Sequence, residues 1–150
     1  MNQVILKQFD LPIDQSLAFT YFIDEDKLNQ WLCYEAVTDP YVDGRYELYW
    51  EPDEDHQNST EGCRITVFEN PYLIAFDWKG PRSLDEVMNR IDPLTHVTVV
   101  FYPLDHDRVR LILQHSGFGH GEDWQQARMF FNRAWDLALQ RLVKLLESEA

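Results

Sequence analysis

The five histidines are the residues whose chemistry could make this protein a metal-binding protein or an enzyme. His56 and His106 lie in polar stretches that are typical of turns. His115 and His120 are separated by glycines, and no third histidine or cysteine follows at the spacing of a zinc site. The pattern therefore predicts no bound metal.

His115 is the histidine best placed for acid–base chemistry. Strand-like alternation puts it on the same inward face as Leu111 and Leu113. Two interpretations stay open: a core histidine hydrogen-bonded to a backbone carbonyl, or a polar group that contacts a ligand and exchanges a proton with it. Asp77 alternates with inward aromatic residues, so we expect its carboxylate to face water and assign it no catalytic role.

The sequence contains no arrangement of residues that is typical of nucleophilic catalysis. Cys33 and Cys63 have no adjacent His or Lys to activate a thiolate, and two cysteines are too few for a disulfide framework, so we expect both to be reduced. Glu122 and Asp123 are neighbours on a predicted helix and point about 100° apart, which does not make an acid–base pair. The chain has no Gly-x-Ser-x-Gly motif and no phosphate-binding glycine loop. We therefore predict no catalytic residue and no cofactor.

Aromatic and apolar residues offer a different kind of site, one that binds a small molecule. Their periodicity turns them toward the interior, where they form either an ordinary core or the wall of a cavity. Tyr46, His115 and Arg128 would orient the polar end of a ligand. Because a buried unpaired charge is costly, the Arg128 side chain either reaches water or meets an anionic group. The predicted ligand-binding residues are Tyr46, Leu48, Trp50, Phe76, Trp78, Val99, Phe101, Leu113, His115, Trp124, Arg128, Phe131 and Trp135.

The elements that must position these residues follow from the periodicity of the sequence. Alternation with period two predicts strands, and apolar residues spaced three and four apart predict helices. A solvated hairpin loop is expected over 51–61, and a helical turn or lid between 79 and 95. Strands are expected over 4–9, 45–50, 63–67, 74–78, 97–101 and 109–115, a short helix after Pro12, a second over 25–32 capped by Asp24, and a long helix over 122–149.

This order of elements predicts one α+β domain over residues 1–150. We expect a curved antiparallel sheet of about six to seven strands, two short helices after the first strand and one long C-terminal helix. The long helix can bury its apolar face only against the sheet. If the sheet curls around the helix, the two surfaces diverge over part of their length and leave a cavity.

The charge balance restricts the possible partners. The chain carries 13 basic and 26 acidic residues, and residues 1–61 hold 14 of the acids with only 3 bases. Nucleic acid and anionic membranes would be repelled, whereas a cationic protein partner is compatible. No stretch approaches 18 apolar residues, and the first residues lack the pattern of a signal peptide. We therefore expect a cytoplasmic protein without membrane insertion, as a monomer or homodimer.

Several segments, in a fixed order, resemble one protein family. They are 24–31 (DEDKLNQW), 37–40 (VTDP), 44–48 (GRYEL), 70–73 (NPYL), 76–78 (FDW), 115–118 (HSGF) and 134–146, which begins AWD. Together they are similar to the activator-of-heat-shock-protein-90-ATPase homologue family. That family belongs to the helix-grip superfamily of START lipid-transfer domains, polyketide cyclases and the birch pollen allergen. The resemblance implies a curved sheet gripping the C-terminal helix around a hydrophobic cavity, usually without metal or covalent cofactor.

Three functions fit this interpretation. The first is a non-enzymatic module that binds a small hydrophobic or amphipathic molecule between the sheet and the C-terminal helix. The second, implied by the resemblance, is an interaction protein that regulates a chaperone ATPase through its acidic N-terminal half. The third is a cyclase-like enzyme that uses His115 or another polar group of the cavity as acid or base.

Overall fold

The computed structural model describes residues 3–52 and 55–149 and contains two antiparallel sheets. The larger sheet has five strands in the order β1-β7-β6-β5-β4, and the smaller one pairs β2 with β3. The strands are β1 (Ile5–Leu11), β2 (Glu35–Thr38), β3 (Tyr46–Tyr49), β4 (Ile65–Glu69), β5 (Leu73–Trp78), β6 (Thr95–Asp105) and β7 (Arg108–Ser116). The expected α+β class and strand number are confirmed, but the strands form two sheets and not one.

The division between the sheets has a local cause in the turn that precedes β3. The Asp39 carboxylate accepts hydrogen bonds from the backbone and guanidinium of Arg45, the latter at 2.7 Å. A Cβ on Gly44 would lie only 2.1 Å from the carbonyl oxygen of Asp39, so this close approach requires glycine. The region of β3 is joined to the region of β4 by isolated bridges and separate backbone hydrogen bonds, such as that from Tyr46 to the carbonyl of Cys63 at 2.9 Å, and not by a continuous strand pairing. Trp50, predicted within a strand, lies just beyond the end of β3.

The helices are α1 (Gln15–Thr20), α2 (Glu25–Trp31), η1 (Arg82–Leu84), α3 (Asp85–Met88) and α4 (Glu122–Glu149). Asp14 caps α1 by accepting a hydrogen bond from the amide of Leu17 at 2.8 Å. Asp24 occupies the N-cap position of α2, but its side chain makes no capping hydrogen bond, which corrects the expected role. Its carboxylate lies instead 3.6 Å from the ammonium of Lys27. The helical turn expected between 79 and 95 is formed by η1 and α3.

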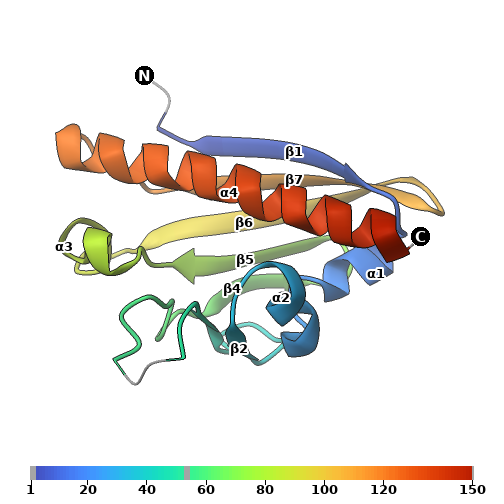
Figure 1. Ribbon diagram of the computed structural model, residues 1–150, viewed down its shortest axis with the longest axis horizontal. Coiled ribbons are helices and arrows are strands. Elements are labelled where there is room, and N and C mark those ends of the chain that lie inside the picture. Colours follow the sequence, from blue (N-terminus) through green and yellow to red (C-terminus); the bar gives the residue numbers. More distant parts are fainter. Residues whose placement is uncertain (1–2, 53–54, 150) are drawn as a thin grey trace.

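The long helix α4 crosses one face of the larger sheet (Figure 1). Inward residues of β6 and β7 face it in register, with Val97 opposite His115 and Val99 opposite Leu113. An ion pair of 2.9 Å between Lys7 on β1 and Asp136 adds a polar link to the edge strand. The buried residues of α4 are Ala127, Phe131, Trp135, Ala138, Leu139, Leu142 and Leu146. This is the helix-grip arrangement. No helix among the described residues is both long and apolar enough to cross a membrane.

Candidate functional site

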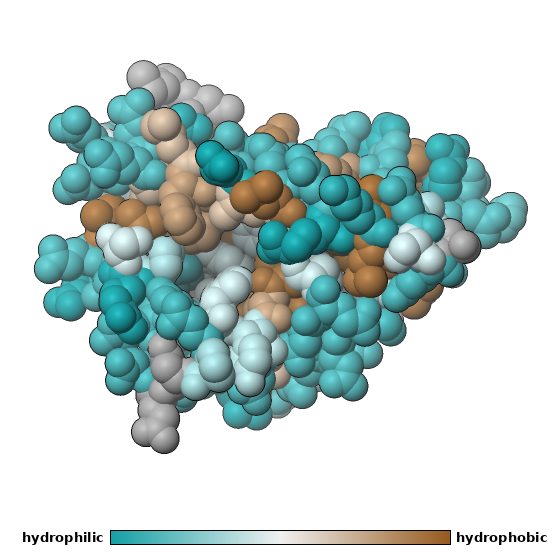
Figure 2. Space-filling model, viewed as in Figure 1, coloured by the Kyte–Doolittle hydropathy of each residue, from teal (hydrophilic) through white to brown (hydrophobic). Residues whose placement is uncertain are grey.

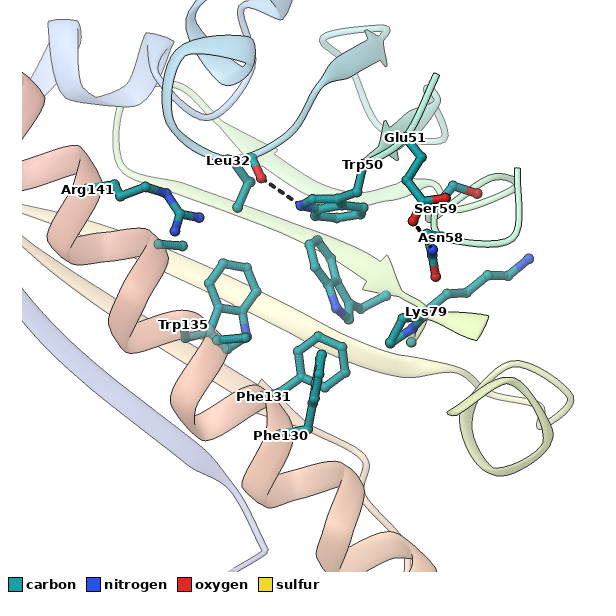
Figure 3. Close-up of a pocket in the computed structure, with 15 residues that line it drawn as sticks. Leu32, Trp50, Glu51, Asn58, Ser59, Lys79, Phe130, Phe131, Trp135 and Arg141 are labelled. Atoms are coloured by element: carbon teal, nitrogen blue, oxygen red, sulfur yellow. Dashed lines mark hydrogen bonds between the residues drawn. The ribbon is translucent and has the colours of Figure 1, made fainter. Parts of the chain in front are cut away.

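A cavity of about 320 Å³ opens between α4 and the end of β5. Figure 3 shows its side chains converging from α4 on one side and from the segments around Leu32 and Trp50 on the other. Figure 2 shows hydrophobic residues gathered along α4 beside a hollow in this face of the molecule. The volume lies at the small end of the range of roughly 300–1,000 Å³ found for ligand pockets. The lining residues are Leu32, Trp50, Glu51, Asn58, Ser59, Trp78, Lys79, Gly80, Pro81, Phe130, Phe131, Ala134, Trp135, Ala138 and Arg141.

Trp78 is the centre of an aromatic wall. Its ring lies 5.0 Å from that of Trp135, 5.8 Å from that of Trp50 and 6.3 Å from that of Phe131, measured between centroids. Trp50 is held at the outer side of the cavity because its indole nitrogen donates a hydrogen bond of 2.7 Å to the carbonyl of Leu32 (Figure 3). The wall is therefore apolar, built from rings inclined to one another, and fixed by the protein's own contacts.

The indole donors of this region differ in whether they have an acceptor. Trp31 donates to the carbonyl of Tyr21, and Trp135 donates to Nδ1 of His115 at 3.1 Å. Trp78 is only 2% exposed, yet its Nε1 has no hydrogen-bond partner among the described residues. A buried donor without an acceptor costs about 1–3 kcal/mol relative to a satisfied one. The cavity wall therefore holds one unsatisfied polar group.

His115 has both ring nitrogens engaged. Because an indole can only donate, Nδ1 must be the acceptor toward Trp135, and Nε2–H then points to the hydroxyl of Thr95 at 3.1 Å. Complete burial, with a smaller contribution from His96, lowers the pKa of His115 to about 3. His115 is thus a neutral core histidine, as in the first of the two interpretations, but its partners are two side chains and not a backbone carbonyl.

The polar groups at the cavity rim also contact the protein. Arg141 donates from Nε to the carbonyl of Trp31 at 3.1 Å. Lys79 donates to the carbonyl of Glu61 at 2.7 Å, and its ammonium points away from the aromatic wall in Figure 3. Asn58 donates to the carboxylate of Glu51 at 2.6 Å.

The structure brings together only part of the predicted binding set. Trp50, Trp78, Phe131 and Trp135 line the cavity. Trp124 and Arg128 are half-buried near the start of α4, outside the lining; Trp124 packs against the core beside Phe118 and Gly119. The predicted residues that are buried in the core away from the cavity are Tyr46, Leu48, Phe76, Val99, Phe101, Leu113 and His115.

Tyr46 illustrates why some of the predicted residues are structural. Its hydroxyl donates to the carbonyl of Phe22, and its ring stacks on Phe76 with centroids 3.9 Å apart. Burial raises the pKa of Tyr46 well above its ordinary value, so the phenol stays neutral. The hydroxyl already has its acceptor within the protein, so its donor is not free to orient a ligand.

The two cysteines are buried free thiols. Burial raises the pKa of each, Cys33 and Cys63, to about 12, so neither forms a thiolate near neutral pH. This agrees with the expectation that both are reduced and unreactive.

The cavity residues missing from the predicted set come mostly from loops and from one edge of the buried face of α4. Asn58 and Lys79 have no periodic neighbours that mark them as inward, whereas Leu32 shares a helical face with Leu28. Ala134, Ala138 and Arg141, however, follow one another at spacings of four and three on α4, which is a signal that could have been found. Two alanines in this stripe leave space where larger side chains would fill it.

The buried, hydrogen-bonded state of His115 predicts that the stability of the folded protein decreases in mild acid. The unfolded chain protonates this histidine near pH 6.5, whereas the folded protein does so only near pH 3, so the unfolded state binds more protons between these values. The free energy of unfolding should therefore fall by about 1–3 kcal/mol between pH 6.5 and 4.5. Urea denaturation across this range measures it. H115Q should flatten the dependence, and H106Q, at a side chain that is 90% exposed, should leave it unchanged. Identical pH profiles for native protein and H115Q would contradict the interpretation.

Comparison with known proteins agrees with this architecture. The family model "Activator of Hsp90 ATPase homolog 1-like protein" matches residues 12–147. A Mesorhizobium loti protein superimposes with a TM-score of 0.76 at 15% identity, covering 98% of both chains. An HSP90 activator from Plasmodium falciparum gives 0.69 at 17% identity, with 97% of both chains covered. The Aha1 dimer from Colwellia psychrerythraea gives 0.70 at 14% identity, with 96% of both chains covered.

No curated protein matches the chain. The structural neighbours share too little sequence to establish more than the fold. The family model covers nearly the whole chain and is the stronger finding. The protein therefore belongs to the family of Activator of Hsp90 ATPase homolog 1-like proteins.

Proposed function

We propose that this protein binds a small amphipathic molecule in the cavity between α4 and β5, without transforming it. The cavity has the features of a ligand site: apolar aromatic walls, a few polar groups at the rim and a restricted volume of about 320 Å³. The aromatic wall around Trp78 suits a ring-containing molecule, which would pack against the inclined indole faces.

The single observation that carries this proposal is the unsatisfied Nε1 of Trp78. Native interiors rarely leave a buried donor unpaired, and the indoles of Trp31, Trp50 and Trp135 all have acceptors. Trp78 is also the central ring of the cavity wall. Nε1 itself is buried, so a ligand with a carbonyl, ether or hydroxyl oxygen would supply the missing acceptor once the indole shifted toward the cavity, removing the cost of leaving the donor unpaired.

The condition of the reactive groups favours binding over catalysis. His115 is neutral, with both nitrogens engaged, and therefore has no site for a substrate proton. The described polar groups of the cavity that could act on a substrate, Glu51 and Lys79 among them, are hydrogen-bonded to other parts of the protein. Replacing these contacts with substrate contacts would require the rim to rearrange.

The neutral fluorescent compound N-phenyl-1-naphthylamine tests the cavity. We expect saturable fluorescence enhancement with the native protein, and at least tenfold weaker binding to A134W, because Ala134 lines the cavity and an indole there would occupy it. L137W is the matched control, since Leu137 is 46% exposed on the same helix and lies outside the lining. Circular dichroism verifies that both variants fold. Absence of saturable binding to the native protein, or equal binding by A134W, would refute the proposal.

A matched pair of variants tests whether Nε1 of Trp78 is truly unpaired. Trp78 and Trp135 are both 2% exposed, but only Trp135 donates a hydrogen bond. W135F leaves Nδ1 of His115 without a donor and should cost about 1–3 kcal/mol more in free energy of unfolding than W78F, which loses ring volume alone. Urea denaturation of the two ligand-free variants gives the comparison. An equal or larger loss in W78F would mean that its donor has a partner.

Regulation of a chaperone ATPase is the second candidate function. It is favoured by the family match and by the likeness to the Plasmodium falciparum activator. The acidic residues concentrated in the first 61 positions, such as Asp24, Glu25 and Asp26 at the start of α2, give a surface for a basic partner. The two free buried cysteines fit the reducing cytoplasm, where we place the protein.

An ATPase assay with purified Hsp90 tests this second candidate. We expect addition of the protein to change the rate of ATP hydrolysis, with an effect that weakens as salt concentration rises because the contact is electrostatic. A134W serves as the control, since it alters the cavity and leaves the acidic surface intact. An ATPase rate that is the same with and without the protein would remove chaperone regulation as a function.

A further inference from the structure

We propose that the molecule bound in the cavity is an organic anion whose acidic group is held by Arg141. This inference rests on the proposed binding function and adds the chemical class of the ligand. It comes from three features of Arg141: its place in the cavity lining, its orientation and its lack of an acidic partner.

Arg141 is fixed at the edge of the cavity. Its side chain leaves α4 and turns toward Leu32, on the side of the cavity away from Glu51 and Asn58 (Figure 3). The Nε hydrogen bond to the carbonyl of Trp31 holds the guanidinium in this direction. The two terminal nitrogens have no acceptor among the described residues, so four N–H groups are available to a ligand.

Arg141 has no ion-pair partner among the described residues, as is also true of Arg128 and Arg133, but of these three arginines only Arg141 lines the cavity. No described carboxylate lies within 4.0 Å of Arg141. Basic residues that do have a carboxylate within that distance are Lys7, Lys27, Arg45, Arg90, Arg108 and Arg110. The cavity thus keeps an unneutralised cation at its exposed edge, where an anion that displaces water would meet it beside the apolar walls.

The other charged groups of the lining define the orientation of the ligand. Glu51 lies at the opposite side of the cavity from Arg141, and the ammonium of Lys79 points outward to the carbonyl of Glu61 (Figure 3). An acidic group would therefore be repelled at one end and attracted at the other. A guanidinium presents parallel N–H groups that match a carboxylate, so the ligand's carboxylate belongs at Arg141 and its flat body against the indoles.

The sequence pointed to a different arginine for this role. Arg128 was the candidate for meeting an anionic group, but it lies outside the cavity lining. Arg141 follows Ala134 and Ala138 along the stripe of α4 that borders the cavity. The small side chains of these alanines leave room for a molecule between the aromatic wall and the guanidinium.

Two compounds of nearly identical shape test the charge. At pH 7.5, 2-naphthoate carries a carboxylate and 2-naphthamide carries none, and isothermal titration calorimetry gives both affinities. We expect the native protein to bind 2-naphthoate about tenfold more tightly than 2-naphthamide. R141Q should abolish that difference by weakening only the naphthoate, and R141K, which keeps the charge without the planar fork, should retain part of it.

The control variant is R133Q, which removes the same charge from an exposed arginine of α4 that lies outside the cavity lining. It should leave both affinities unchanged. Equal binding of the two compounds by the native protein, or an unchanged preference in R141Q, would overturn the assignment of Arg141 while leaving the binding function intact. Absence of saturable N-phenyl-1-naphthylamine binding to the native protein would instead overturn the proposed function itself.

Discussion

The hydrogen bond from Trp135 to His115 is the contact on which the site depends, because it fixes α4 to β7 at the depth of the cavity. It requires a neutral histidine, and burial provides one by lowering the pKa of His115 to about 3. It also fixes the ring of Trp135, whose face then packs against Trp78. This buried pair therefore links α4 to β7 and orients one side of the cavity, while burial keeps the histidine neutral.

The cavity itself results from unequal packing on the two sides of α4. Toward β1, the helix is drawn close by buried apolar residues and by the ion pair of Lys7 with Asp136. Toward β5, the helix presents Ala134 and Ala138, which are too small to reach the aromatic wall. A straight helix on a curved sheet cannot maintain contact along both sides. The space that remains is opposite Trp78, the residue with the unsatisfied donor.

Most of the fold could be predicted from the sequence because burial on strands and on one helix face is periodic. The inward phase of His115 and the buried stripe through Phe131 and Trp135 both follow from that periodicity. The cavity could be predicted only in part. Its volume depends on where small side chains, such as that of Ala134, leave space, and periodicity does not show this. Its rim depends on loops, and alternation gives no information about Asn58, although the same phase extends to Trp50, which lines the cavity just beyond the end of β3.

The net charge limits how an anionic ligand can be recognised. A protein with a formal charge of −13 repels an anion at long range, over a distance of about 8 Å at physiological ionic strength. Selectivity must therefore arise from contact, where the ligand has lost water and meets Arg141 beside apolar walls. The same field attracts a basic protein surface to the acidic N-terminal half without any contact at the cavity. Ligand binding would thus use the positive charge of Arg141, and chaperone regulation would use the negative charge of the N-terminal half. The two proposed functions are therefore compatible in one domain.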